Sequence, residues 1–206
     1  MKLSIPFLTY SNIGQKVDFF FKEYHPSIEI PIPIEEIIEL KIGLNIFPYP
    51  SLFREHSLNG FLDRNLSTIS VDDYQYDQLN EKYRYTLAHE LGHYILHKSF
   101  YENLPRFEGP DEYIQWRLSI PHDDMTWFET HSDWFAEQVL VPTSRLIEIC
   151  SEVVERHRST FSKLQVIPDD VWSYISNEVA KYFEVNPPVV QIRIKREGIP
   201  ERIQLV

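Results

Sequence analysis

The chain has 206 residues, which is enough for one domain of ordinary size or two small ones. Apolar residues make up 43% of it and aromatic residues 14%, so a buried core is expected and a disordered chain is excluded. The formal net charge of -11 opposes a protein that wraps nucleic acid or lies on an anionic membrane surface.

The sequence also predicts a cellular compartment. No apolar run approaches the ~18 residues of a transmembrane helix, and the first residues do not resemble a signal peptide. The single cysteine, Cys150, excludes an intramolecular disulfide framework and fits a reducing environment. We therefore expect a cytoplasmic protein, with no direct nucleic-acid partner and no membrane.

The pattern of apolar residues predicts an α+β fold, in which a small antiparallel sheet packs with about five to seven helices. Helices are expected, in chain order, at 14–24, 34–42, 80–98, 126–140, 143–157, 169–183 and 187–197. Strands are expected at 44–49, 58–62 and 66–71, the last two forming a hairpin. The segment 99–126 is punctuated by three prolines and is predicted to be mostly loop.

We expect two parts in this organisation. The first is a catalytic core over residues 1–142, which carries an insertion at about 99–126. The second is a helical extension over residues 143–206 that packs on the core. Asn80 and Asn186 are expected to cap the helices that follow them.

Residues 89–93 read His-Glu-Leu-Gly-His within the long predicted helix. Positions i and i+4 share one face of a helix, so His89 and His93 can bind the same metal ion. Glu90 projects about a third of a turn away, where it can take a proton from a water molecule that the ion activates. This arrangement is typical of a zinc peptidase, with Glu90 as the catalytic residue.

Two further residues of this helix have separate interpretations. Gly92 costs ~1 kcal/mol in a helix interior relative to alanine, which indicates close packing against a neighbouring element. His97 lies ~12 Å along the helix axis from His89, and we interpret it as structural.

A catalytic zinc site needs a third protein ligand and leaves one position open. The predicted helix 126–140 supplies the best candidate, Glu129. Asp133 lies one turn later and can accept the N–H of a ligating histidine. His131 and His122 are the alternatives. His131 is the better zinc donor by residue type, but it lies on the opposite side of the helix from Glu129.

Two spaced blocks of the sequence follow a family pattern. Residues 82–97 place an aromatic and Thr-Leu-Ala lead-in before the His-Glu-Leu-Gly-His motif. Residues 129–142 match Glu-x-x-Ala-Asn-x-Phe-Ala-x-x-Leu-Leu-x-Pro, except that Ser132 and Asp133 replace the usual Ala and Asn. Together the blocks resemble the ImmA/IrrE family of metallopeptidases, and a weaker resemblance covers about residues 14–199.

The resemblance implies a zincin-like core and a cytoplasmic zinc-dependent endopeptidase, with Zn²⁺ held by His89, His93 and Glu129. Members of the family often cut or antagonise a helix-turn-helix repressor of a mobile element or stress regulon, so such a repressor is the implied partner. The segment 99–126 is longer than is usual in the family. It is either a lid over the cleft or a surface insertion.

Two other functions are open at this point. A protein of the same fold could sequester a repressor without cutting it, as in a toxin–antitoxin pair, but binding alone does not need Glu90. A DNA-binding regulator could use the cations of the last predicted helix, Arg193, Lys195 and Arg196. The net charge opposes this function, and we expect that helix to pack on the core through Val189, Ile192 and Ile199.

The residue that donates a hydrogen bond to the transition state is not singled out by the sequence. Tyr113, His122 and His131 are the candidates.

Overall fold

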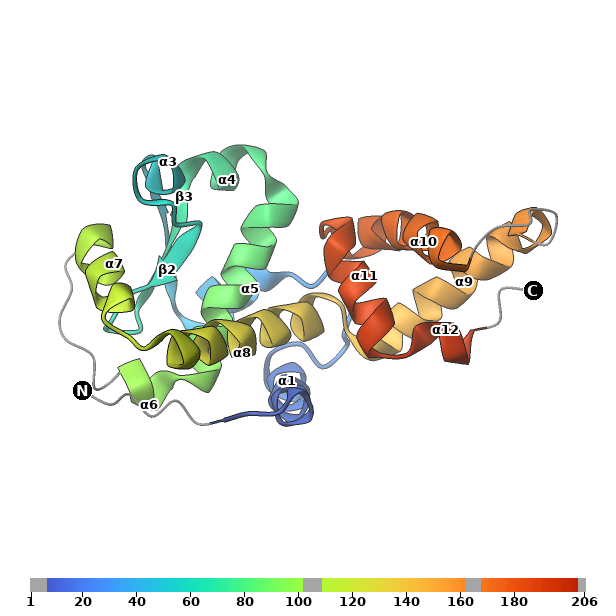
Figure 1. Cartoon of the computed structure of the whole chain (residues 1–206), viewed down its shortest axis with the longest axis horizontal. Coiled ribbons are helices and arrows are strands. Elements are labelled where there is room, and N and C mark those ends of the chain that lie inside the picture. The colour runs from blue at the N-terminus through green and yellow to red at the C-terminus, as the bar shows by residue number, and fades with distance from the viewer. Residues whose placement is uncertain (1–6, 102–108, 162–167, 204–206) are drawn as a thin grey trace. The chain divides into compact units, whose positions relative to one another are not determined.

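The computed structural model describes residues 7–101, 109–161 and 168–203. The chain forms two compact units, shown in Figure 1: an N-terminal unit of residues 1–26 and 33–136, and a C-terminal unit of residues 27–32 and 137–206. Helices dominate both units, and the described part of the chain contains one three-stranded sheet. The predicted α+β class is confirmed. The predicted boundary of the catalytic core after Pro142 stays a prediction.

The N-terminal unit contains the sheet and most of the helices. Its elements are α1 (Tyr10–Tyr24), α2 (Ile34–Glu36), the π-helix η1 (Ile37–Ile42), β1 (Asn45–Tyr49), α3 (Leu52–His56), β2 (Gly60–Leu62), β3 (Thr68–Asp72), α4 (Asp73–Gln78), α5 (Asn80–Leu96), α6 (Lys98–Tyr101), α7 (Pro110–Leu118) and most of α8 (His122–Leu140). Helix α5 begins at Asn80 and is preceded by Leu79 at the capping position, so the cap predicted at Asn80 is wrong by one residue.

The sheet has the strand order β1-β3-β2 and is mixed. Strands β2 and β3 form the predicted antiparallel hairpin, with Phe61 opposite Ser70. Strand β1 runs parallel to β3 and places Phe47 on the other side of Ser70. The prediction of an entirely antiparallel sheet is therefore wrong for β1. The connection from β1 to β3 contains α3 and β2, and it is long enough for the crossover that parallel pairing requires.

The segment predicted to be mostly loop contains α7 and the start of α8. Pro110 is the first residue of α7, and Pro121 directly precedes α8. Proline is tolerated at a helix start because the N–H that it lacks has no intrahelical partner there. These prolines thus mark the beginnings of helices. Pro105 lies outside the described residues.

The C-terminal unit is helical. It contains the end of α8, then α9 (Thr143–Phe161), α10 (Pro168–Phe183), α11 (Pro187–Arg196) and α12 (Ile199–Arg202). In α11 the buried apolar residues are Val190 and Ile194, whereas Ile192 is 40% exposed. The prediction that Ile192 lies on the packed face is wrong. The central buried position of that face belongs to Arg193, a residue type that the apolar pattern does not count.

Arg193 is fully buried and connects α11 to the start of α9 and to the residue that follows α8. Its Nε donates to the carbonyl oxygen of Val141 at 3.1 Å, and its Nη2 donates to Thr143 Oγ1 at 2.7 Å. Its Nη1 lies 2.6 Å from a carboxylate oxygen of Glu197. On the same helix Arg196 pairs with Glu137 at 2.5 Å. Two of the three cations considered for DNA binding are therefore engaged within the protein.

We expect Arg193→Met to lower the free energy of unfolding by about 3–5 kcal/mol, because it removes the buried guanidinium and the hydrogen bonds that it donates. Urea unfolding followed by circular dichroism measures the change. Arg202→Met, at an exposed arginine, is the control. A loss below about 1 kcal/mol in Arg193→Met would contradict a structural role for this side chain.

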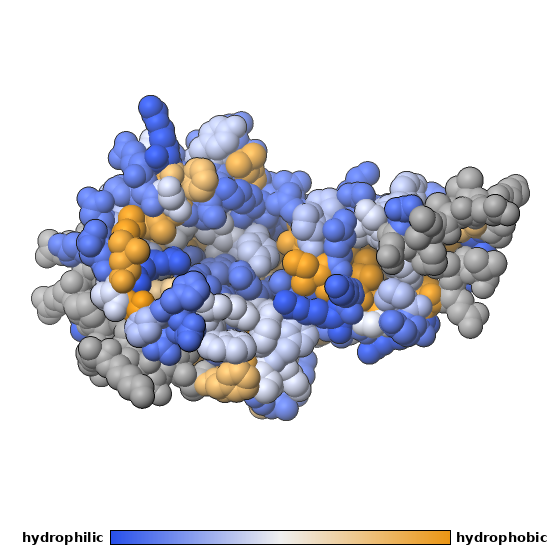
Figure 2. Space-filling view, viewed as in Figure 1, coloured by the Kyte–Doolittle hydropathy of each residue, from blue (hydrophilic) through white to orange (hydrophobic). Residues whose placement is uncertain are grey.

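No helix within the described ranges combines the length and the apolar character needed to cross a membrane. On the face shown in Figure 2, hydrophilic residues cover most of the N-terminal unit, and hydrophobic residues reach the surface in small separate areas. Scattered exposed hydrophobic side chains are normal in folded proteins.

Candidate metal centre and catalytic site

Helices α5 and α8 are in close contact at Gly92. A Cβ atom added to Gly92 would lie 3.0 Å from the Cα atom and 3.2 Å from the carbonyl oxygen of Ser132. Both atoms are backbone atoms, so they cannot move aside as a flexible side chain would. The close packing predicted at Gly92 is confirmed, and it places the His-Glu-Leu-Gly-His motif directly beside Ser132 on α8.

Gly92→Ala should therefore destabilise the protein by about 1–3 kcal/mol, even though alanine gains ~1 kcal/mol in helix propensity. Thermal and urea unfolding measure the effect. Gly109→Ala is the matched control, because an added Cβ meets no atom within 4 Å there. If Gly92→Ala were as stable as the wild type, the two helices would have room that the structure does not show.

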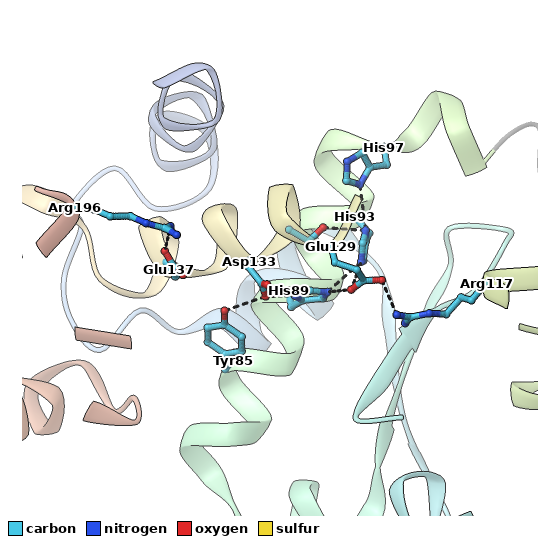
Figure 3. Close-up of polar contacts among 10 residues, drawn as sticks. Tyr85, His89, His93, His97, Arg117, Glu129, Asp133, Glu137 and Arg196 are labelled. Atoms are coloured by element: carbon cyan, nitrogen blue, oxygen red, sulfur yellow. Dashed lines mark hydrogen bonds and ion pairs between the residues drawn. The ribbon is translucent and has the colours of Figure 1, made fainter. Parts of the chain in front are cut away.

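Three side chains converge between α5 and α8, as Figure 3 shows. His89 Nε2 lies 3.1 Å from Glu129 Oε2 and 3.1 Å from His93 Nε2. The distance between His93 Nε2 and Glu129 Oε2 is 3.9 Å. Zinc bonds of about 2.0–2.2 Å place tetrahedral donor atoms about 3.3–3.6 Å apart. The structure thus brings the three predicted ligands together at a spacing that suits one metal ion.

Asp133 contacts His89 at the nitrogen that does not face Glu129. Its Oδ1 lies 2.9 Å from His89 Nδ1 and accepts a hydrogen bond from the Tyr85 hydroxyl at 3.1 Å. Burial lowers the pKa of His89, but hydrogen bonds to Asp133 and Glu129 outweigh it and raise the pKa to about 10. A carboxylate in this position fixes the ring orientation and the tautomer of a ligating histidine. Asp133 lies where the sequence predicts it.

His93 is almost completely buried and stacks on Phe128, with the ring centroids 4.1 Å apart. Its Nδ1 lies 2.9 Å from Ser132 Oγ and 3.1 Å from His97 Nδ1. Burial, together with the positive charge of His89, holds the pKa of His93 well below its usual value. The neutral ring has a lone pair that can bind a metal. The His93–His97 contact was not predicted, although the two residues are one helical turn apart.

The alternative ligands lie elsewhere. His131 is fully buried, but its Nδ1 lies 3.4 Å from His97 Nε2, and its Nε2 accepts the N–H of Leu8 at 3.3 Å. His122 is exposed at the start of α8. The structure therefore groups Glu129, and neither of the alternatives, with the two histidines of the motif.

Glu90 is buried beside this group. Burial raises the pKa of its carboxyl to about 7, against the lowering effect of His89 and of a hydrogen bond from the backbone of Leu62. Its Oε2 has no hydrogen-bond partner among the described residues. Strand β2 packs tightly against α5 beside Glu90, since a Cβ added to Gly60 would lie 2.7 Å from the methyl group of Thr86. A carboxylate with an unpaired buried oxygen is suited to binding a water molecule.

A cavity of about 280 Å³ opens on these side chains and is lined by His89, Glu90 and Glu129, among others. It is also lined by Arg117 from α7, which lies in the segment predicted to be mostly loop and was not among the predicted site residues. Arg117 Nη2 lies 2.9 Å from Glu129 Oε1. Tyr113, one of the predicted transition-state donors, is buried and hydrogen-bonded to Arg117.

Comparison with known families shows the family to which the chain belongs. The sequence model of the IrrE N-terminal-like domain, a peptidase family, matches residues 75–195, more than half of the chain. The chain belongs to the ImmA/IrrE family of peptidases. The match includes both sequence blocks that suggested this family, and therefore every residue of the proposed centre. The comparison with curated proteins gave no match.

Proposed function

We propose that this ImmA/IrrE family peptidase is a zinc-dependent endopeptidase. The observation that carries the proposal is the convergence of His89 Nε2, His93 Nε2 and Glu129 Oε2, within 3.1–3.9 Å of one another, beside the unpaired Oε2 of Glu90. Two imidazoles and one carboxylate form a donor set typical of catalytic zinc, and three protein ligands leave one position open.

The residues of the chain divide the chemistry between them. A bound Zn²⁺ would polarise a peptide carbonyl and lower the pKa of a water molecule. Glu90 accepts the proton of the attacking water at Oε2 and passes it to the leaving nitrogen. Burial raises the pKa of this carboxyl above its usual value in the metal-free chain, which favours acceptance of a proton there. Asp133 orients His89, and Ser132 orients His93, each through a contact with the Nδ1 atom of the ring.

The substrate that we propose is a helix-turn-helix repressor. The family resemblance supports this choice. The net charge of -11 also supports it, because a DNA-binding substrate is usually basic and opposite charges speed association. The alternative is sequestration of such a repressor without cleavage, which would leave Glu90 without a role.

The test uses the full chain loaded with zinc and the repressor encoded by a neighbouring gene, if one is present there. Mass spectrometry of the mixture identifies any cleavage site, and 1,10-phenanthroline removes the metal in a parallel sample. We expect a single set of fragments that disappears with the chelator. Tight binding without fragments would favour sequestration. Fragments that persist with the chelator would contradict a zinc mechanism.

A further inference from the structure

We propose that Arg117 is the residue that binds the carbonyl oxygen of the scissile peptide and stabilises the negative charge on it in the transition state. This inference rests on the proposed function. It assigns a role that the sequence left open among Tyr113, His122 and His131.

The position of Arg117 suits this role. The residue lies on α7 and lines the same cavity as Glu90 and Glu129. Among the described residues that line this cavity, Arg117 and His89 are the ones that can carry a positive charge. Figure 3 shows the guanidinium reaching Glu129 from a different element than the two histidines. Substrate bound in the cavity would therefore lie against it.

The guanidinium also has more N–H donors than its two contacts in the site use. Arginine carries five N–H groups in a planar fork. One contact goes to Glu129 Oε1 at 2.9 Å, and another goes to the hydroxyl of Tyr113. Tyr113 is itself fixed by stacking on Phe61, with the ring centroids 5.2 Å apart. These two contacts leave N–H groups of the guanidinium that could donate to a carbonyl oxygen.

The positive charge of Arg117 lies beside the carboxylates of the site. Its Nη2 is 2.9 Å from Glu129 Oε1, and Glu90 lines the same cavity. A cation in this position lies close to where negative charge develops on the substrate. In a partly buried site such a charge is screened less than in water.

The other candidates are already engaged or lie outside the cavity. Tyr113 is buried and hydrogen-bonded to Arg117. His131 is hydrogen-bonded to His97 and to the backbone N–H of Leu8. Neither His131 nor His122 is among the residues lining the cavity.

A simpler role must be separated from this one. The 2.9 Å contact could serve only to hold Glu129 in place for the metal. In that case loss of Arg117 would lower zinc affinity, and saturating zinc would restore the full kcat. A transition-state donor behaves differently, since its loss lowers kcat even when the metal site is full.

The experiment compares Arg117→Ala and Arg117→Lys with the wild type at saturating zinc. The substrate is the fastest-cut member of a fluorescence-quenched library of random peptides. Arg158→Ala is the control, because it removes an arginine whose partner is the exposed Glu155 in the other unit. We expect kcat of Arg117→Ala to fall by about 10²- to 10³-fold with little change in KM. Arg117→Lys should fall less, since it keeps the charge without the fork.

Chemical rescue distinguishes a direct role from an indirect one. Millimolar guanidinium chloride should restore part of the activity of Arg117→Ala and leave that of Arg158→Ala unchanged. Full kcat of Arg117→Ala at saturating zinc, or a lowered kcat that guanidinium does not raise, would overturn the assignment.

A binding measurement keeps this inference separate from the proposed function. If the wild type cuts neither the repressor nor any peptide in the library, the endopeptidase proposal fails. Calorimetric titration with an N-phosphoryl dipeptide, a tetrahedral anion, still tests Arg117 in that case. We expect Arg117→Ala to bind it at least about tenfold more weakly than Arg158→Ala, in line with the loss of a charge-assisted hydrogen bond. Equal affinities would overturn the assignment.

Discussion

Replacing Glu90 with glutamine should reduce peptide hydrolysis by about 10²- to 10⁴-fold, the usual contribution of a general base. Glutamine has nearly the same shape, but its amide cannot accept the proton of the attacking water. Glu90 is absent from the group of three donor atoms, so zinc content should not change. Turnover of the repressor, or of the library peptide, by the zinc-loaded variant measures the effect.

Glu148→Gln is the matched control for this substitution, because Glu148 is a surface carboxylate paired with Arg145. Unfolding curves of both variants check the fold. Wild-type rates of hydrolysis from Glu90→Gln would show that Glu90 is not the general base. The assignment of the zinc ligands would not be affected by that result.

Replacing Glu129 with alanine should lower zinc affinity by more than about 100-fold. Substitution of a residue that hydrogen-bonds to a metal ligand already lowers metal affinity by about 10- to 100-fold, and this change removes a ligand outright. His89→Ala should have a comparable effect, for the same reason. Competition with a chromophoric chelator measures the affinity, and elemental analysis measures zinc per chain.

Glu148→Ala again serves as the surface control. The double variant Glu129→Ala with His131→Ala settles the competing assignment. Stoichiometric zinc in Glu129→Ala that disappears in the double variant would make His131 the third ligand. The structure leads us to expect no such rescue, since His131 is bonded to Leu8 and His97.

The centre itself could be predicted because its information is local. His89 and His93 share a helix face by spacing alone, and Glu129 with Asp133 follows the same one-turn rule on α8. Gly92 signalled where the two helices meet, because a glycine inside a helix needs a packing reason. These features depend on helical geometry, which the sequence pattern determines well.

The features that were missed depend on tertiary contacts or on ambiguous residues. Arg117 lines the site from α7, and Pro110 at the start of this helix is a residue type that predicts a loop as readily as a helix start. Strand β1 pairs parallel with β3, a choice that no local pattern records. Arg193 occupies a core position through three hydrogen bonds, which apolar periodicity cannot anticipate.

The row of buried histidines behind the site has a consequence for the placement of protons. Burial lowers the pKa values of His93, His97 and His131, so each ring is neutral and carries one proton. The N–H of Leu8 makes His131 Nε2 an acceptor, so His131 donates from Nδ1 to His97, and His97 in turn donates to His93 Nδ1.

That direction leaves the proton of His93 on Nε2, the nitrogen that faces His89 and Glu129. A His93 that binds metal through Nε2 must carry its proton on Nδ1 instead. Ser132 Oγ, 2.9 Å away, can accept it there. With the tautomers of His97 and His131 unchanged, two N–H groups would then face each other across the 3.1 Å between His93 and His97. Metal binding at His93 is therefore coupled either to opening of this contact or to a change of tautomer along the row of histidines.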